Sequence, residues 1–202
     1  MDIKVINNIP NINVTVNKSE DGSFAILVAE KKKTLGDVVP GEVVKIGNRE
    51  YIVLGHGKET TSVITKEIVK KIPFGKTTDW VQSNVRSYCN GDFYNELANV
   101  VGKKNIIQHT VSLIADDGTG KGNSCKDNVS ILVTEQYRRY RKFLPPMCGE
   151  WWWCATRVNA DNNNYSSYIC CIDVNGILRW DYCDHDCGVR PFCILNSSIS
   201  IS

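Results

Sequence analysis

Apolar and polar residues alternate in short runs along most of the chain, a pattern that predicts short β-strands joined by turns. Two such runs, at residues 12–16 and 24–28, precede the charged sequence Glu30-Lys31-Lys32-Lys33. Because this charged sequence separates the two runs from the rest, we expect residues 1–38 to form an N-terminal β appendage or linker. Residues 39–202 would form the main domain.

The main domain begins with a predicted hairpin, because residues 43–46 and 51–54 are β-prone and flank a turn at Gly47-Asn48. A short helix is predicted over residues 80–88. A second helix is predicted by apolar residues at i, i+4, i+7 and i+8, followed by Gly102 as a stop: Phe93, Leu97, Val100 and Val101.

The next segment combines a loop, a strand and a helix. Residues 116–127 are rich in Gly and Asp and are expected to form a loop, and residues 129–133 a short strand. Thr134 is expected to cap a helix over residues 135–143. The sequence Gly118-Thr119-Gly120-Lys121-Gly122-Asn123 lacks the spacing of a phosphate-binding loop, so we interpret it as an exposed loop.

The C-terminal part is predicted to be β. Residues 167–174 and 177–182 flank a turn at Asn175-Gly176, and a further strand is expected over residues 189–195. Strands and helices are mixed without regular alternation. The predicted class is therefore α+β, with a mixed, mainly antiparallel sheet and two or three short helices.

Composition and charge exclude several function classes. The 202 residues carry a formal net charge of +2, too small and too evenly spread to indicate nucleic-acid binding. No apolar window is long enough for a membrane-spanning helix. Met1-Asp2-Ile3-Lys4 leads into polar residues where a signal peptide would be apolar. We expect no nucleic-acid partner, no membrane insertion and no signal peptide.

The last 52 residues differ sharply in composition from those before them. Residues 1–150 contain 16 Lys, 9 Glu, 3 Gln and 2 Met, whereas residues 151–202 contain none of these four types. A block of buried strands would lose Lys and Glu. Yet the same segment has five Asp, three Arg and the polar run at residues 161–168, so burial explains only part of the difference.

A genetic origin accounts for the difference more completely. Codons of the form NNY encode fifteen amino acids and cannot encode Lys, Glu, Gln, Met or Trp. Between Val158 and Val189 only Trp180 falls outside that set. Randomisation at the adenines of AAY codons would produce such a segment.

Several separated motifs resemble the C-type-lectin-like fold, and more narrowly an uncharacterised bacterial and phage family that ends in G-V-R-P. The C-terminal motifs are Trp151-Trp152-Trp153-Cys154-Ala155-Thr156-Arg157, Tyr168, Val174-Asn175-Gly176 and Gly188-Val189-Arg190-Pro191-Phe192. The family's helix motif is matched by Trp80, Ser83, Arg86, Asn90, Phe93 and Tyr94, and its next block by Asp127, Ser130, Leu132 and Glu135. The resemblance covers about residues 40–196. Cys154 stands where the family usually has Leu, and we expect it to be buried.

Similar domains are the variable proteins of diversity-generating retroelements, in which a C-terminal stretch is rewritten by adenine mutagenesis and displayed. The resemblance implies a ligand-binding, non-enzymatic protein with a variable region at about residues 157–188. Tyrosines there would supply rigid contact area, and Asn, Ser and Asp adaptable hydrogen bonds. The predicted surface comprises Asn159, Asp161, Asn163, Asn164, Tyr165, Ser166, Ser167, Tyr168, Cys170, Cys171, Asp173, Asp181, Tyr182, Asp184, His185 and Asp186.

The resemblance also implies a biological setting. The chain would be a phage or prophage host-attachment protein that binds a host cell-surface protein or glycan, and its mildly acidic face would favour a basic or neutral ligand. It would lie in a phage virion, in the tail or attachment apparatus, or on a bacterial surface reached by a non-Sec route. Residues 1–38 would contact other virion or display components or form a homo-oligomer.

We expect no metal and no cofactor. Residues 161–166 lack the acidic and glycine positions of an EF-type calcium loop. On a strand, Cys183, His185 and Cys187 would share one face, but the outer two would lie about 13 Å apart, too far to bind one zinc ion. Only a loop at these residues could bring them together. The nine cysteines, with Cys170 and Cys171 adjacent, suit no disulfide framework and are interpreted as mostly reduced.

Two alternatives remain open. The formylglycine-generating enzyme shares this broad fold and uses a cysteine pair, which Cys183 and Cys187 could mimic in an oxidoreductase. The chain could instead be a purely structural virion protein. His56 and His109 are isolated and belong to no nucleophile motif. In the run from Trp151 to Trp153 we expect alternate members in the core, and we expect Arg190 to pair internally.

Overall fold

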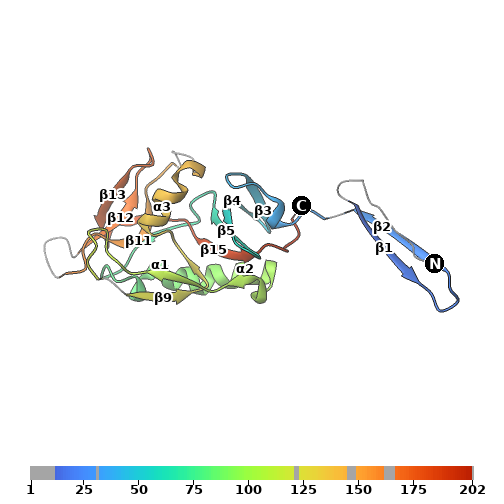
Figure 1. Cartoon of the computed structure of the whole chain (residues 1–202). Helices are drawn as coiled ribbons and strands as arrows, with labels where there is room; N and C mark the ends of the chain where they lie inside the picture. Colours follow the sequence, from blue (N-terminus) through green and yellow to red (C-terminus); the bar gives the residue numbers. More distant parts are fainter. Residues whose placement is uncertain (1–11, 31, 121–122, 145–148, 162–166, 202) are drawn as a thin grey trace.

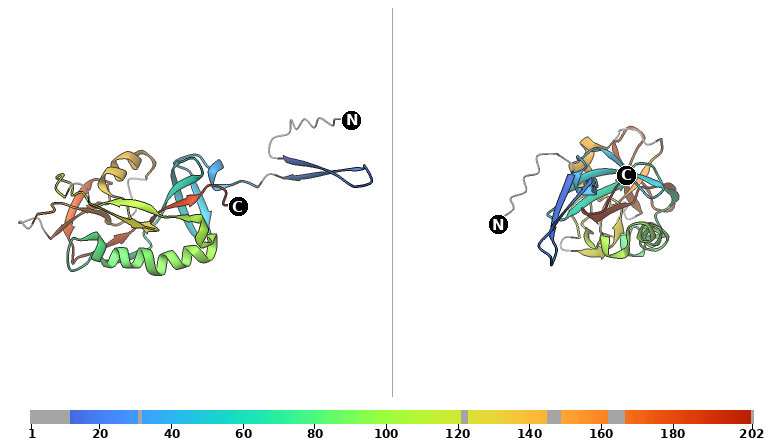
Figure 2. Two further views of the ribbon diagram at one scale, coloured as in Figure 1. Left: turned by 60° about the horizontal axis from the view of Figure 1, so that its bottom comes forward. Right: turned by 90° about the vertical axis from the view of Figure 1, so that its right-hand side faces the viewer.

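The computed structural model describes residues 12–30, 32–120, 123–144, 149–161 and 167–201 and has an α+β architecture (Figure 1). The α-helices in the described residues are α1 (Asn84–Tyr88), α2 (Tyr94–Val101) and α3 (Thr134–Tyr140). A π-helical turn at Cys89–Phe93 joins α1 to α2, and Figure 2 shows the two as one continuous helical segment. Short 3-10 turns lie at Leu35–Asp37, Trp80–Gln82, Lys103–Asn105 and Arg141–Phe143.

One sheet has the strand order β10-β15-β5-β4-β3, with β7 also paired to β15. Every pair in this sheet is antiparallel. Its strands are β3 (Val43–Ile46), β4 (Arg49–His56), β5 (Thr60–Thr65), β7 (Ile106–Ile107), β10 (Val129–Ser130) and β15 (Phe192–Asn196).

A second sheet has the order β13-β12-β11-β14-β6, in which only β11 and β14 pair in parallel. Its strands are β6 (Lys70–Pro73), β11 (Trp152–Arg157), β12 (Tyr168–Ile172), β13 (Leu178–Tyr182) and β14 (Asp186–Val189). Two hairpins stand apart from these sheets, β1 (Ile12–Lys18) with β2 (Phe24–Glu30) and β8 (His109–Ser112) with β9 (Ser124–Asp127). The predicted α+β class with mainly antiparallel pairing is confirmed.

The core consists of two apolar clusters, one on each face of β11. Trp153 lies in the first cluster, where its ring contacts Phe74 edge-on and its Nε1 donates to the carbonyl of Ile72. Trp152 lies in the second cluster against Tyr137. Since β11 is covered on both faces, adjacent tryptophans are both buried, and the prediction that only alternate members enter the core is wrong.

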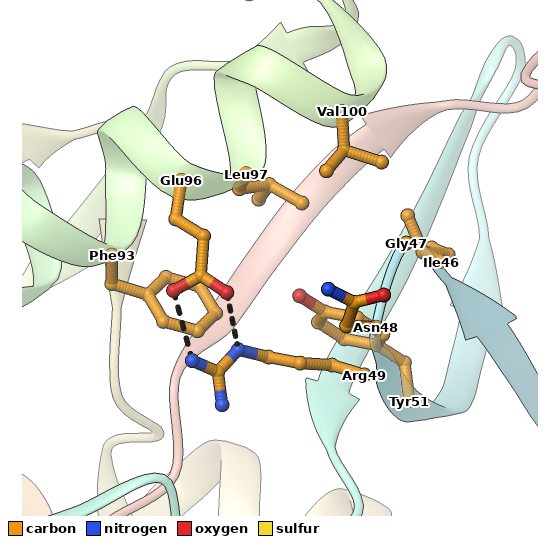
Figure 3. A pocket seen from close by; sticks show the side chains of 9 residues that line it. All are labelled: Ile46, Gly47, Asn48, Arg49, Tyr51, Phe93, Glu96, Leu97 and Val100. Atoms are coloured by element: carbon orange, nitrogen blue, oxygen red, sulfur yellow. Dashed lines mark hydrogen bonds and ion pairs between the residues drawn. The ribbon is translucent and has the colours of Figure 1, made fainter.

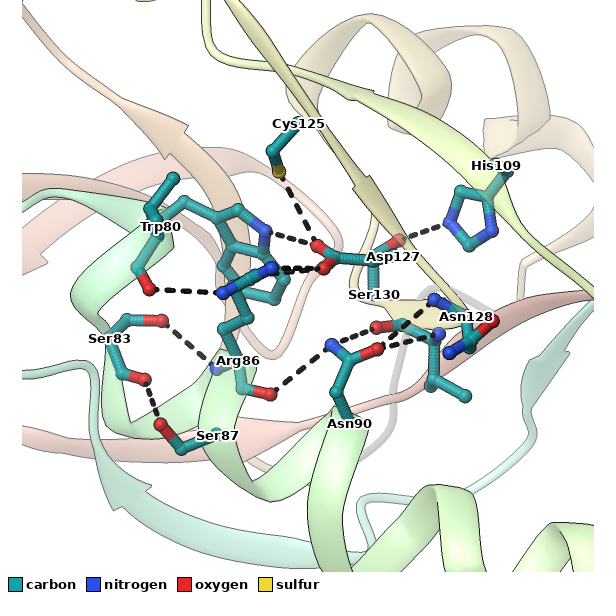
Figure 4. A network of polar contacts seen from close by, with 12 residues as sticks. Trp80, Ser83, Arg86, Ser87, Asn90, His109, Cys125, Asp127, Asn128 and Ser130 are labelled. Carbon is teal, nitrogen blue, oxygen red and sulfur yellow. Dashed lines mark hydrogen bonds and ion pairs between the residues drawn. The ribbon is translucent and has the colours of Figure 1, made fainter.

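A buried polar network ties α1 to β9 and explains the separated sequence motifs (Figure 4). Asp127 is 2% exposed; its carboxylate accepts hydrogen bonds from Trp80 Nε1 and Arg86 Nε, each at 2.8 Å. The side chain of Asn90 accepts from the backbone N–H groups of Asn128 and Val129. The two motif blocks therefore meet in one structural joint.

Arg190 is fully buried and donates to backbone carbonyls, so its predicted internal pairing is confirmed. Its Nε and Nη2 donate to the carbonyl of Thr65 at 3.1 and 2.9 Å, and Nη2 also reaches the carbonyl of Lys66. Its guanidinium lies 4.9 Å from the ring of Trp152. Cys154 is buried as expected.

The chain enters the domain beside its own C-terminal segment. Leu35, which is fully buried, donates its N–H to the carbonyl of Ile199, and Thr34 forms a β-bridge with Ser200. The β1–β2 hairpin lies beyond the end of the domain that carries the C-terminus, whereas β12 and β13 lie at the opposite end (Figure 1 and the left view of Figure 2). No helix in the described part of the chain is long and apolar enough to cross a membrane.

Three local predictions differ from the structure. Val133, not Thr134, precedes the first turn of α3, because the Thr134 hydroxyl donates to Asp116 instead of capping the helix. The strand predicted over residues 129–133 is limited to β10. The predicted loop at residues 116–127 ends in β9, which is held by pairing with β8.

Candidate functional site

The β12–β13 hairpin carries half of the described positions of the predicted variable surface, and its turn is held by several hydrogen bonds. The Asp173 carboxylate accepts from the N–H groups of Asn175 and Ile177, both at 2.9 Å, and from Arg179 Nε at 3.1 Å. Gly176 adopts a φ of 70°, as the predicted turn requires. The hydrogen bonds, that of Ile177 foremost, lower the pKa of Asp173.

Helix α3 holds the same turn from one side. The Tyr137 hydroxyl donates to the carbonyl of Gly176 at 2.6 Å, and Arg141 Nε donates to the same oxygen at 3.0 Å. The hairpin is thus fastened at its turn, while its other end points away from the α3 contact. A fastened hairpin can present side chains in a fixed geometry, which reduces the entropy lost when a ligand binds.

An exposed group of aromatic rings lies at the free end of this hairpin, and we call Tyr168, Trp180, Tyr182 and His185 the aromatic patch. Ring centroids are 4.8 Å apart for Tyr168 and Trp180, 4.4 Å for Tyr168 and Tyr182, and 5.3 Å for Tyr182 and His185. Trp180 is 53% exposed and Tyr182 is 45% exposed. Aromatic side chains gathered at a surface offer large contact area at low cost in side-chain entropy.

A shallow hollow of about 340 Å³ lies on the other side of β13, and we call it the β13 hollow. Trp151, 38% exposed, and the carboxylates of Asp181 and Asp186 line it, and Lys71 there pairs with Glu150 at 3.0 Å. Asp181 links the hollow to the aromatic patch, because its Oδ1 lies 2.8 Å from His185 Nδ1. The two features lie on different sides of β13 and are connected through Asp181, and together they make up the candidate site.

The start of the predicted variable region packs against the loop before β9. Asn159 donates its side-chain amide to the Asp117 carboxylate, and the N–H of Ala160 donates to the Thr119 hydroxyl at 2.8 Å. Hydrogen bonds from Thr119 lower the pKa of Asp117. Asn159 is half-buried in this contact and Asp161 is exposed.

The predicted surface residues fall into three groups in the structure. Those with exposed or half-buried side chains are Asn159, Asp161, Ser167, Tyr168, Asp181, Tyr182, Asp184, His185 and Asp186. Asn163, Asn164, Tyr165 and Ser166 lie outside the described residues. Cys170, Cys171 and Asp173 are buried, at 2%, 0% and 5% exposure.

The buried group corrects the prediction. Cys170 and Cys171 point to opposite faces of β12, one into each apolar cluster, because both faces of this strand are covered. The Asp173 carboxylate is fully engaged in holding the turn. A large ligand cannot reach these three side chains in this conformation, so they support the surface rather than form it.

Two exposed tryptophans were missed by the sequence prediction. The predicted surface omits Trp180 because no NNY codon encodes Trp, and it omits Trp151 because the strand pattern places it at one end of a core strand. Pairing of Tyr168 with Tyr182 places Trp180, two residues earlier on β13, beside Tyr168 on the same face. That period of two, read from the Asn175-Gly176 turn, was the signal that could have found Trp180.

The cysteines of this region are free and disfavour the thiolate form. Burial raises the pKa of Cys187 to about 12, raises that of Cys170 to about 12, and raises those of Cys171 and Cys183. A reactive cysteine needs the opposite shift. Among the described residues, no group of three or more His, Cys, Asp or Glu side chains is placed to hold a metal ion.

Two histidines take structural positions. His109 Nε2 lies 2.9 Å from the Ser130 hydroxyl, but Ser130 is 1% exposed, so a substrate could not reach this Ser–His pair. Burial lowers the pKa of His109. Both ring nitrogens of His56 are hydrogen-bonded, to Thr61 Oγ1 and to the carbonyl of Val38.

A second pocket, at the end of the domain remote from β12 and β13, is a structural joint (Figure 3). It measures about 140 Å³, and the bidentate Arg49–Glu96 ion pair crosses it over the ring of Phe93. The pair connects β4 to α2. Since both charges are already paired, this pocket is a weaker candidate for ligand binding than the β13 hollow.

Comparisons of the chain with protein-family models, with curated proteins and with solved structures found no match.

Proposed function

We propose that this chain is a ligand-binding protein of C-type-lectin-like fold that displays a surface diversified by a retroelement. The site comprises the aromatic patch and the β13 hollow. The protein acts as a host-attachment protein of a phage or prophage, in the virion or at a bacterial surface, and its ligand is a host cell-surface protein or glycan.

One observation carries the proposal: within the Lys- and Glu-free segment, the exposed polar and aromatic residues between Trp180 and Asp186 gather at one end of the domain. Trp180, Tyr182, Asp184, His185 and Asp186 are all exposed on β13, on β14 or in the turn between them. The apolar residues of the same segment are mostly buried. A segment that keeps its core constant and varies its exposed end is suited to display.

The buried positions of the motif residues support the proposal that the rest of the domain is a scaffold for the site. The Trp80–Arg86–Asp127 network and the buried Arg190 fix the positions of strands around the site without entering it. Fixed supporting residues and exposed variable ones have separate roles here, as a display scaffold requires.

The charges of the site favour a basic or neutral polar ligand. Asp181 contacts His185 and lines the β13 hollow together with Asp186, and Asp184 is exposed in the adjoining turn, whereas Lys71 is paired with Glu150 and Arg179 with Asp173. A sugar could stack on Trp180 and accept or donate hydrogen bonds at the carboxylates. A protein ligand would place a basic side chain in the β13 hollow.

The enzymatic alternative receives less support. Cys183 and Cys187, the candidate pair, are both buried, and burial raises the pKa of each thiol. Neither is prepared to act as a nucleophile at neutral pH in this conformation.

Sequencing the gene and its flanks from many individuals of one population tests the proposal. We expect substitutions at Tyr182, Asp184 and His185, matched to adenines in a near-identical template copy. Trp180 and Gly188 should stay constant. Gly188 has a physical reason to do so, because a Cβ there would lie 2.5 Å from Ile68 Cδ1 and 2.8 Å from the carbonyl of Trp151. Even variation along the chain, or none in this region, would contradict the proposal.

A glycan array read with the purified protein tests the site itself. Trp180→Ala should weaken the affinity for any glycan that the wild-type protein binds by at least tenfold. Ile177→Ala is the matched control, since Ile177 is 46% exposed on the same hairpin but lies in the turn near α3. Equal losses in both variants would place the ligand elsewhere.

A further inference from the structure

The β1–β2 hairpin has one apolar face and one on which Leu27 lies among small and polar residues. The pairing register places opposite residues on the same face, so six apolar side chains share one side: Ile12, Val14, Val16, Phe24, Ile26 and Val28. Thr15, Asn17, Ala25, Leu27 and Ala29 occupy the other side. Phe24, Ile26 and Val28 are 41%, 61% and 62% exposed, whereas the three residues of β1 are half-buried, so the β2 half of this face is uncovered.

A two-stranded hairpin of this kind is marginal by itself. Within the described residues β1 and β2 pair only with each other, and burial of the apolar face is the main source of stability that an isolated hairpin lacks. Every residue of β2 is exposed. The apolar face therefore has the composition of a surface that is buried against a partner.

The charges at the two ends of the hairpin indicate what covers it. Lys18 ends the apolar face near the turn, opposite Phe24, and Glu30 ends it near the domain, opposite Ile12. Beyond these, the turn carries Glu20 and Asp21, and the segment leading to the domain carries Lys32 and Lys33. The hairpin is thus acidic beyond Lys18 and basic beyond Glu30.

We propose that the apolar face binds the same face of a second copy of this chain, with the two hairpins antiparallel about a two-fold axis. In that orientation Lys18 of each copy meets Glu30 of the other, and each acidic turn meets the other copy's basic segment. A parallel arrangement would place Lys18 on Lys18 and Glu30 on Glu30, and like charges at close range disfavour it. The interface is isologous, as in most dimers.

The size of the face sets the expected affinity. Two strands of seven residues, at about 3.3 Å per residue, give a face about 20 Å long and about 10 Å wide, which is smaller than the interfaces of stable complexes. The dimer should therefore dissociate on dilution. Because the hairpins are antiparallel, the two domains project from opposite ends, and their β12–β13 ends point away from each other. This inference does not depend on what those ends bind.

Sedimentation equilibrium of the full chain over a wide concentration range tests the dimer. We expect a mass that rises with concentration from 22.7 kDa towards twice that value and no further. Ile26→Lys should weaken association at least tenfold. Leu27→Lys is the matched control, because Leu27 is 57% exposed on the opposite face and should leave association unchanged. A monomer at every concentration, a larger oligomer, or equal effects of the two variants would overturn the proposal, the first pointing to another virion or display component as partner.

A charge reversal tests the orientation. Lys18→Glu should weaken the dimer, because it places two carboxylates, the introduced one and that of Glu30, against each other. Adding Glu30→Lys should restore the attraction and with it the dimer. In a parallel dimer the double variant would recover nothing. If the double variant dimerises no more strongly than the single variant at low salt, the antiparallel arrangement is refuted.

Discussion

Replacement of Asp127 tests the buried network that holds α1 to β9. The carboxylate is 2% exposed and accepts two bonds of 2.8 Å, one from Trp80 and one from Arg86. Asp127→Ala leaves Trp80 Nε1 without an acceptor in a site that is itself 2% exposed, which costs about 1–3 kcal/mol. It also removes a charge-assisted bond from Arg86, worth about 1.5–3 kcal/mol.

The exposure of Arg86 limits the total loss of unfolding free energy expected for Asp127→Ala. Its side chain is 29% exposed, so the guanidinium can regain water when its partner is removed. The cost of breaking a fully buried pair, about 3–5 kcal/mol, is therefore an upper limit. We expect Asp127→Ala to lower the free energy of unfolding by about 3 kcal/mol. Asp127→Asn should cost less, because an amide oxygen still accepts from Trp80.

Urea unfolding followed by circular dichroism measures this loss as a lower transition midpoint at unchanged slope. Glu135→Ala is the control: Glu135 pairs with Arg139 on the surface of α3, with both side chains more than half exposed. Its removal should change stability by less than about 0.5 kcal/mol. A loss below about 1 kcal/mol for Asp127→Ala would refute the reasoning that this network carries the packing of α1.

Three further outcomes are expected. Gly188→Ala should destabilise the fold by about 1–3 kcal/mol, measured by thermal unfolding, because the added Cβ collides with Ile68 and with the backbone of Trp151. Asp173→Asn should lower stability at pH 7. Because folding lowers the pKa of Asp173, the stability contributed by its carboxylate is present above about pH 4 and disappears as pH falls through the folded-state pKa. The urea midpoints of variant and wild type should therefore converge in acid. Cys187, whose pKa burial raises to about 12, should react with a thiol reagent at neutral pH only at the rate of unfolding, and immediate labelling of native protein would contradict its burial.

Elements with strong turn signals could be predicted from sequence. Gly47 adopts a φ of 60° at the turn between β3 and β4, and Gly102, with a φ of 82°, ends α2 as predicted. The β12–β13 register follows from the Asn175-Gly176 turn. In each case a residue with a specific backbone conformation fixed the boundary, independently of the rest of the fold.

Features that depend on tertiary neighbours could not be predicted. Burial of both Trp152 and Trp153 requires knowing that β11 is the central strand, and the same holds for Cys170 and Cys171 on β12. The strand β5 was not predicted, because its Thr- and Ser-rich sequence resembles an exposed segment until it pairs with β4 and β15. For the site, composition identifies the segment but not which of its residues face outward.

The distribution of exposure separates the two explanations for the missing Lys and Glu. Burial accounts for their absence from β11, β12 and the stretch from Cys187 to Cys193, where nearly every side chain is covered. It does not account for residues 177–186, most of which are exposed and where Lys and Glu would be well tolerated. Apart from Trp180, the residue types found there are ones that NNY codons encode, and they include the exposed carboxylates and, from the aromatic patch, Tyr182 and His185. A variable segment that crosses the core can vary only where it surfaces, so we expect substitutions at the exposed positions of residues 177–186 and constancy at the covered positions of β11 and β12.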